Sequence, residues 1–208
     1  PHAGASPAPR AAPAPVPGEW TVIAPIPRGT PPYNAAQTWN HKSGRFVDYS
    51  RAERIDTYRD TSGKILFHCV RLIVDGKKIT PIVSRARHED GREEWTTVRP
   101  PAPYPFMGLP ALADKPYATV LIFEGEKKRA LAETALEAHA CLSVLGGTVG
   151  GGRMDLTPLR GRHVVLWPDA DEPGRAMVAG MGEALAGIAA SVAYVETEGM
   201  PDGHDVAD

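Results

Sequence analysis

Cysteine is scarce in this chain: only Cys69 and Cys141 occur among 208 residues, and the sequence contains no Cys-x-x-Cys pair. Two isolated cysteines do not make a four-ligand zinc site, and we expect two buried thiols rather than a disulfide. This cysteine usage favours a reducing, cytoplasmic setting.

Long apolar segments are also missing. No run approaches the roughly 18 apolar residues of a membrane-spanning helix. No basic segment followed by an apolar one opens the chain, as a secretory signal would. We therefore expect no membrane association. The sequence begins without Met and stops at Asp208, and we expect it to be a fragment of a longer protein.

Charge is spread unevenly, although the net charge is only −2. Residues 33–117 hold 14 Lys and Arg against 10 Asp and Glu, whereas residues 118–208 hold 7 against 14. The first region, at +4, suits contact with phosphates. The second, at −7, has the spare carboxylates that a site for a hard cation requires.

Three regions differ in composition. Residues 1–32 are rich in Pro and Ala. Because proline fixes φ and lacks an N–H donor, we expect a linker or tail there, with a short docked strand at 20–23. Residues 33–117 predict a small β-rich domain, and residues 118–208 predict a separate α/β domain.

The β-rich region contains strand and turn signals. The segments 55–59 and 64–71 predict two strands around an Asp-Thr-Ser-Gly turn. Asp75-Gly76 predicts a second turn before a strand at 77–83, and Trp95 belongs to a fourth strand. An antiparallel sheet is the simplest packing of these strands.

The last region alternates strands and helices. Its expected strands are the apolar runs at 118–123, 141–145, 163–167 and 191–195. Between them, the Ala- and Glu-rich segments 125–139 and 173–185 predict helices. This alternation predicts a parallel four-strand sheet with flanking helices.

Carboxylates follow three of these strands. Glu124 follows the first, Asp169 and Asp171 follow the third, and Asp205 lies beyond the fourth. Because ligands bind at the carboxyl ends of parallel strands, we expect these side chains to meet at one edge of the sheet. Clustered carboxylates repel one another unless a cation lies among them, and Mg²⁺ suits such a site.

These motifs resemble the Toprim domain, a Rossmann-like fold shared by bacterial-type primases, topoisomerases and some nucleases. The resemblance rests on a strand ending in Glu-Gly, a second ending in Asp-x-Asp about 45 residues later, and a Gly-Arg helix start. Glu-Gly-Glu-Lys, Pro-Asp-Ala-Asp-Glu-Pro-Gly-Arg and Pro-Asp-Gly-His-Asp are most similar to primases of phages, plasmids and other mobile elements. Tyr58-Arg-Asp-x-x-Gly63 and Tyr104-Pro-Phe-Met-Gly-Leu109 resemble the same group.

The resemblance implies a DNA primase, which makes short RNA primers on single-stranded DNA from NTPs with Mg²⁺ or Mn²⁺, beside a helicase. It implies that Glu124 is a general acid/base or a metal-linked carboxylate, and that Lys127 contacts a phosphate. It also implies that Asp169, Asp171 and Asp205 hold metal. Nucleotidyl transfer needs a metal to neutralise phosphate charge and a base near the attacking hydroxyl.

Basic residues interleaved with aromatic ones in the β-rich region suit a nucleic-acid strand. The candidates for nucleic-acid or nucleotide contact are Arg71, Lys77, Lys78, Arg85 and Arg87, together with Arg175 at the second helix start. The same residues also fit a solvated surface around a small aromatic core.

Other interpretations stay open. A Toprim nuclease would use the same carboxylates, and a non-catalytic nucleic-acid or nucleotide-binding module would keep only the fold. A topoisomerase fits less well, because no catalytic tyrosine domain is evident. Each motif also has a structural alternative: Asp-x-Asp can cap a helix, Asp202-Gly203 can form a turn, and Lys127 can be a solvated helix lysine.

Overall fold

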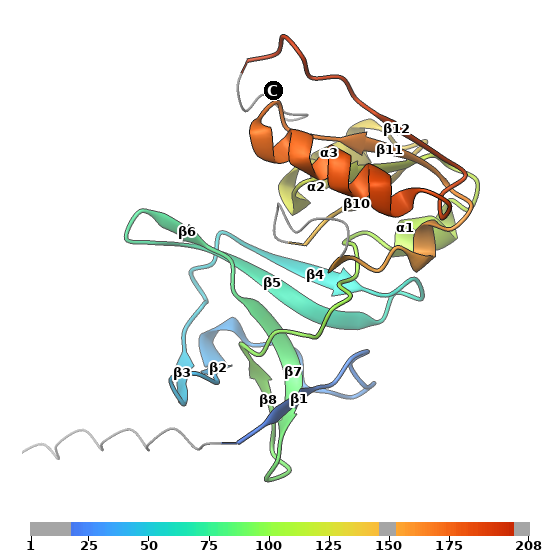
Figure 1. Cartoon of the computed structure of the whole chain (residues 1–208). Coiled ribbons are helices and arrows are strands. Elements are labelled where there is room, and N and C mark those ends of the chain that lie inside the picture. Colours follow the sequence, from blue (N-terminus) through green and yellow to red (C-terminus); the bar gives the residue numbers. More distant parts are fainter. Residues whose placement is uncertain (1–17, 146–152, 202–208) are drawn as a thin grey trace, which may run out of the picture.

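The computed structural model describes residues 18–145 and 153–201, which form a β-rich part and a parallel α/β part (Figure 1). The predicted residue Asp205 lies outside the described residues, as does the stretch 1–17 of the predicted tail. None of the helices in the described ranges is long and apolar enough to cross a membrane.

The β-rich part contains one eight-stranded mixed sheet, with the order β3-β2-β8-β7-β5-β4, β1 on β7 and β6 on β5. Its pairs are antiparallel except for the parallel pair β2–β8. The strands are β1 (Trp20–Val22), β2 (Thr38–Asn40), β3 (Arg45–Val47), β4 (Arg54–Arg59), β5 (Ile65–Val74), β6 (Lys77–Ile79), β7 (Ile82–His88) and β8 (Glu93–Thr96).

The docked strand expected at 20–23 is present as β1, which pairs with β7. The segment after it also packs on the sheet. The backbone N–H of Ile26 donates to the Ile65 carbonyl at 2.8 Å, and the indole of Trp95 donates to the Pro31 carbonyl at 3.0 Å. Residues 18–32 of the predicted tail therefore form part of the folded unit.

The second part is a four-stranded parallel sheet with the order β10-β9-β11-β12, as the alternating pattern predicted. The sheet and its helices are β9 (Val120–Phe123), β10 (Ala140–Ser143), β11 (His163–Trp167), β12 (Ser191–Tyr194), α1 (Pro110–Asp114), α2 (Glu126–Ala135) and α3 (Glu172–Leu185). Alternate residues of β9 face different helices. Ile122 packs in the cluster that includes α3, and Phe123 packs in the cluster that includes Ala132 of α2.

The two parts share a core. Tyr58 and Phe67 of the β-rich sheet belong to the same buried cluster as Ile122 and Leu166 of the parallel sheet. The connecting segment contributes as well: Met107 exchanges backbone hydrogen bonds of 3.0 and 3.1 Å with Ser143, so it pairs with the edge strand β10. The end of β9 is thereby held against β4 and β5. The domain boundary at 117/118 stays a prediction.

Candidate active site

Glu124 stands at the carboxyl end of β9, whose four residues are all buried. Its side chain is only 9% exposed, and Oε1 accepts a hydrogen bond of 3.0 Å from the backbone N–H of Asp169. Asp169 follows β11, the neighbouring parallel strand. The two acidic segments therefore meet at one edge of the sheet, as strand order requires.

The two aspartates after β11 have different surroundings. Asp171 is the N-cap of α3, and its Oδ1 accepts a hydrogen bond of 2.7 Å from the Gly174 N–H. This is the helix-capping role that the sequence left open for the Asp-x-Asp motif. Asp169 instead forms an ion pair with Lys128 through Oδ2, while its Oδ1 is buried with no hydrogen-bond partner in the described parts of the chain.

Gly174 allows the start of α3 to lie against this pair. A Cβ at Gly174 would lie 2.2 Å from the carbonyl oxygen of Asp169 and 2.8 Å from Oε1 of Glu124. Real Cβ atoms do not approach other atoms so closely, so only glycine fits without displacing the backbone of Asp169. The glycine of the Gly-Arg helix start thus has a steric cause.

The electrostatics of Glu124 follow from this packing. Burial raises the pKa of Glu124 above its ordinary value, and the negative charges of Asp169 and Asp171 raise it further. The hydrogen bond from the Asp169 N–H and the positive charge of Lys128 act in the opposite direction. A buried carboxylate of raised pKa in a cavity is a candidate for proton transfer.

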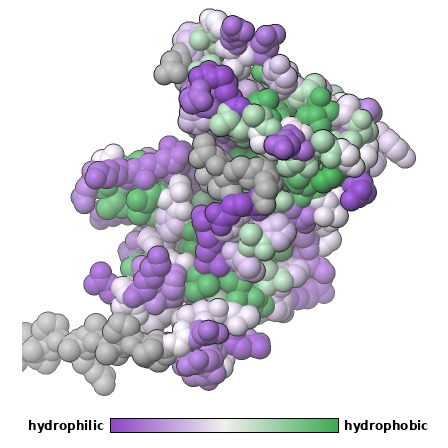
Figure 2. All heavy atoms as spheres, viewed as in Figure 1, coloured by the Kyte–Doolittle hydropathy of each residue, from purple (hydrophilic) through white to green (hydrophobic). Residues whose placement is uncertain are grey.

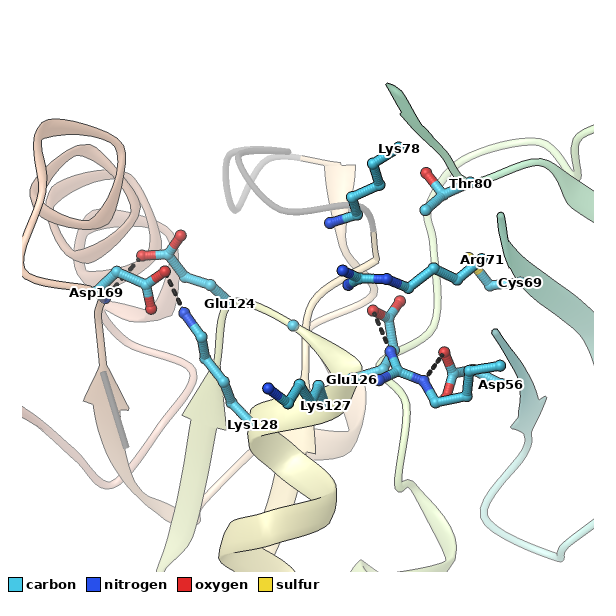
Figure 3. A pocket seen from close by; sticks show the side chains of 12 residues that line it. Asp56, Cys69, Arg71, Lys78, Thr80, Glu124, Glu126, Lys127, Lys128 and Asp169 are labelled. Atoms are coloured by element: carbon cyan, nitrogen blue, oxygen red, sulfur yellow. Dashed lines mark hydrogen bonds and ion pairs between the residues drawn. The ribbon is translucent and has the colours of Figure 1, made fainter. Parts of the chain in front are cut away.

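A cavity of about 420 Å³ opens beside Glu124, between the end of β9 and the face of β4, β5 and β6. In Figure 3, Arg71 and Lys78 point from the β-rich sheet toward Glu124 and Lys127 on the opposite wall. The cavity is lined by Arg54, Asp56, Cys69, Arg71, Lys78, Thr80, Glu124, Gly125, Glu126, Lys127, Lys128 and Asp169. Carboxylates and cations thus face one another across a space large enough for a small polar ligand.

Five of the predicted site residues line this cavity: Glu124, Lys127, Asp169, Arg71 and Lys78. They come from two sheets and from separate stretches of the chain. The structure thus brings part of the acidic set and part of the basic set to one cavity, and their roles there stay predictions.

The other predicted residues that the structure describes are not in the cavity lining. Arg85 and Arg87 both pair with Glu93, at 3.4 and 2.7 Å. Arg175 pairs with Glu172 of its own helix at 3.1 Å on the exposed surface. Lys77 is exposed on β6, and strand alternation turns it to the opposite face from Lys78. Their contact with nucleic acid stays a prediction.

Sequence reasoning missed several cavity residues, among them Arg54, Asp56, Glu126 and Lys128. Alternation along β4 places Arg54 and Asp56 on one face, but no motif marks that face as part of a site. Nothing in the sequence distinguishes Lys128 from Lys127, and the structure gives Lys128 the ion pair with Asp169.

Comparison with known proteins gives structural relatives only. No family model and no curated protein matches the chain. The Aquifex aeolicus primase, in a structure of its zinc-binding and RNA polymerase domains, matches with a TM-score of 0.53, 20% identity and 78% of this chain covered. A DNA primase domain from Pseudomonas aeruginosa matches with a TM-score of 0.52, 14% identity and 83% covered.

The fold resembles that of DNA primase domains. The chain spans 38% of the first of these structures and 50% of the second, so it corresponds to part of each. Both sheets of this chain, the parallel four-strand sheet and the larger mixed sheet, are consistent with the fold of these primase domains. At 20% and 14% identity, the similarity shows the fold.

The chemistry of the cavity is compatible with a hard cation, although the ligand set is incomplete. Within residues 18–145 and 153–201, no group of three or more His, Cys, Asp or Glu side chains could hold one metal ion. Glu124 and Asp169 nevertheless offer carboxylate oxygens, and the unpartnered Oδ1 of Asp169 is a vacant acceptor. Such oxygens are the ligands that Mg²⁺ and Mn²⁺ prefer.

Proposed function

We propose that this chain is the catalytic part of a Toprim-type DNA primase of the kind carried by phages, plasmids and other mobile elements. It would make short RNA primers on single-stranded DNA from NTPs. The observation that carries the proposal is the cavity: Glu124 and Asp169 form one wall, and Arg71 and Lys78 reach in from the other.

The cations that line both sides of the cavity are suited to nucleotide phosphates. Arg71 and Lys78 come from β5 and β6, and Lys127 stands in the first turn of α2. Arginine and lysine bind phosphate oxygens through charge-assisted hydrogen bonds. These three cations would orient the triphosphate of an incoming NTP so that its α-phosphate lies beside Glu124.

The acidic wall is suited to a divalent cation and a proton. Asp169 and Asp171, with Asp205 as a further carboxylate, would hold Mg²⁺ or Mn²⁺, with Glu124 at its side. The metal would supply neutralisation of phosphate charge. Glu124, whose pKa is raised, would accept the proton of the attacking 3′-hydroxyl.

A helicase, as a further domain or a separate subunit, is the proposed partner, because unwound single strands are the substrate of such an enzyme. The exposed basic residues outside the cavity, Lys77, Arg85, Arg87 and Arg175, are proposed contacts for the template strand.

The direct test combines the chain with a single-stranded template, labelled NTPs and Mg²⁺ or Mn²⁺. We expect primers from the wild type and none from Glu124→Gln or Asp169→Asn, whereas Glu137→Gln, an exposed change just beyond the C-terminal end of α2, leaves synthesis intact. Template cleavage without NTPs would replace this proposal with a nuclease. Normal template binding without any product would replace it with a binding module.

A further inference from the structure

Two sequence motifs of the candidate primase meet in the structure through one hydrogen bond. The hydroxyl of Tyr58, from the Tyr-Arg-Asp-x-x-Gly segment, donates to Oε1 of Glu126 at 2.8 Å across 68 residues of sequence. Glu126 is the second glutamate of Glu-Gly-Glu-Lys, and the function proposed above gives neither residue a role. Both lie at the junction of the two sheets.

Tyr58 is well placed to hold Glu126. Its side chain is fully buried, and its ring stacks on Phe67 with centroids 4.6 Å apart and planes 18° from parallel. The core therefore fixes the ring, and only the hydroxyl reaches Glu126. Burial, together with the nearby charge of Glu126, raises the pKa of Tyr58 well above its usual range, so the hydroxyl stays a donor.

Glu126 has a second contact on the same sheet. Its Oε2 lies 3.8 Å from a guanidinium nitrogen of Arg54, and Nε of Arg54 donates to Asp56 at 2.8 Å. Arg54, Asp56 and Glu126 all line the cavity that contains Glu124. A continuous polar network thus runs from β4 to the first residue of α2.

This network connects the turn between β9 and α2 to the β-rich sheet. Gly125 is the N-cap of α2 and offers no side-chain cap, and a Cβ built there would contact nothing within 4 Å. Glu126 ties this turn to the β-rich sheet through Tyr58 and Arg54. Lys127, the next residue, and Glu124, two residues earlier, are the groups that must face Arg71 and Lys78.

We propose that Tyr58 and Glu126 are positioning residues, which hold the turn from Glu124 to Lys127 in register with the basic wall formed by β5 and β6. This inference rests on the proposed function for its catalytic consequence, but the contact itself can be tested separately. Neither residue would touch the reacting atoms.

The test compares Tyr58→Phe with the control Tyr33→Phe. The Tyr33 hydroxyl is also hydrogen-bonded to a side chain, with 2.8 Å between it and the Thr38 hydroxyl, but it lies away from the cavity. We expect Tyr58→Phe to lower kcat for primer synthesis about tenfold, the low end of the effect of supporting residues at active sites. Glu126→Ala should cause a similar loss that Tyr58→Phe does not deepen. Glu126→Gln, which still accepts the Tyr58 hydrogen bond, should restore most of the rate.

Hydrogen exchange of the peptide 124–128 provides a readout that does not depend on primer synthesis. We expect Tyr58→Phe to speed its exchange about tenfold relative to β11, while Tyr33→Phe leaves the ratio unchanged. The positioning role is wrong if Tyr58→Phe leaves the exchange of 124–128 unchanged. It is also wrong if the exchange of β11 speeds up equally, so that the ratio of the two rates stays constant. If the wild type makes no primers, the proposed function fails, and the exchange ratio still decides whether Tyr58 and Glu126 hold the turn.

Discussion

Oε1 of Glu124 accepts a hydrogen bond of 3.0 Å from the backbone N–H of Asp169, 45 residues away. This contact joins the ends of two parallel strands and places two carboxylates of one charge sign side by side. The ion pair of Asp169 with Lys128 offsets part of their repulsion. The proposed function needs both carboxylates, whereas their mutual repulsion lowers the stability of the fold. This leads to the first prediction.

Glu124→Gln should stabilise the metal-free protein at neutral pH while it abolishes primer synthesis. The pKa of Glu124 is raised from its ordinary value of 4.5, so the folded state holds the Glu124 proton more tightly than the unfolded state does. The contribution of protonated Glu124 to the free energy of unfolding is fully present below about pH 4. It is lost as the pH rises through the raised pKa. Glutamine does not titrate, so the advantage of the variant should grow from pH 4.5 to pH 8 in urea unfolding. A pH-independent difference would contradict this.

Gly174→Ala should destabilise the protein by about 1–3 kcal/mol, the usual cost of forcing an atom into a filled space. The added Cβ would lie 2.2 Å from the Asp169 carbonyl oxygen. Gly180→Ala is the matched control in the same helix, because its Cβ would meet nothing within 4 Å. It should stabilise the protein by up to about 1 kcal/mol through helix propensity. Urea unfolding measures both, and equal effects would argue against the steric role of Gly174.

Lys78→Ala should weaken binding of Mg²⁺-ATP about tenfold, consistent with the loss of one hydrogen bond to a charged group. Lys77→Ala should change it less than about twofold, because Lys77 is not part of the cavity lining. Calorimetric titration of the two variants compares neighbouring lysines of equal charge. Equal losses would indicate a diffuse electrostatic effect instead of a phosphate contact by Lys78.

His68 should make the protein sensitive to mild acid. Burial lowers the pKa of His68 from 6.5 to about 4, so the unfolded state takes up a proton that the folded state refuses. The contribution of neutral His68 to the free energy of unfolding is fully present above pH 6.5. It is lost as the pH falls toward 4, by up to about 3 kcal/mol. His68→Phe keeps an aromatic ring beside Tyr33 and should lose less stability between pH 7.5 and pH 4.5 in urea unfolding. A loss equal to that of the wild type would show that other groups cause it.

Local sequence patterns predicted the parallel sheet well. The apolar run before Glu124 is a fully buried strand, and the run before Asp169 is a strand in which Val164 and Leu166 are buried. The helices begin close to the expected residues. A short apolar run can be a strand or a buried helix segment, and here the length of four to six residues and the flanking turn residues favour a strand. The order of acidic motifs then placed Glu124 and Asp169 at the same edge, since parallel strands end on the same side.

Patterns that depend on distant contacts were not predictable. The strand expected at 77–83 is interrupted before Ile82, with Lys78 on β6 and the strand β7 following Pro81. The short strands β2 and β3 were not expected, because a segment of three residues, some of them polar, gives little indication of a strand. Trp39 in β2 is covered by Arg92, whose guanidinium lies 4.9 Å from the ring centroid. Helix α2 ends at Ala135, four residues before the predicted end.

The site could be predicted only in part for the same reason. Glu124, Asp169 and the neighbouring Lys127 belong to contiguous motifs, and motifs are visible in a sequence. The contact of Tyr58 with Glu126 and the approach of Arg71 to the acidic wall arise from the way two sheets pack. Neither has a local sequence signature.

The core cluster that includes Tyr58, Phe67, Ile122 and Leu166 has a consequence for recombination between relatives. A chimera joined near residue 117 would inherit the two sides of one interior from different parents. Side-chain volumes on β4 and β5 would then no longer match those on β9 and β11. The residues of the basic wall, Arg71 and Lys78, line the cavity and are not members of this core cluster, so they can be exchanged without altering it.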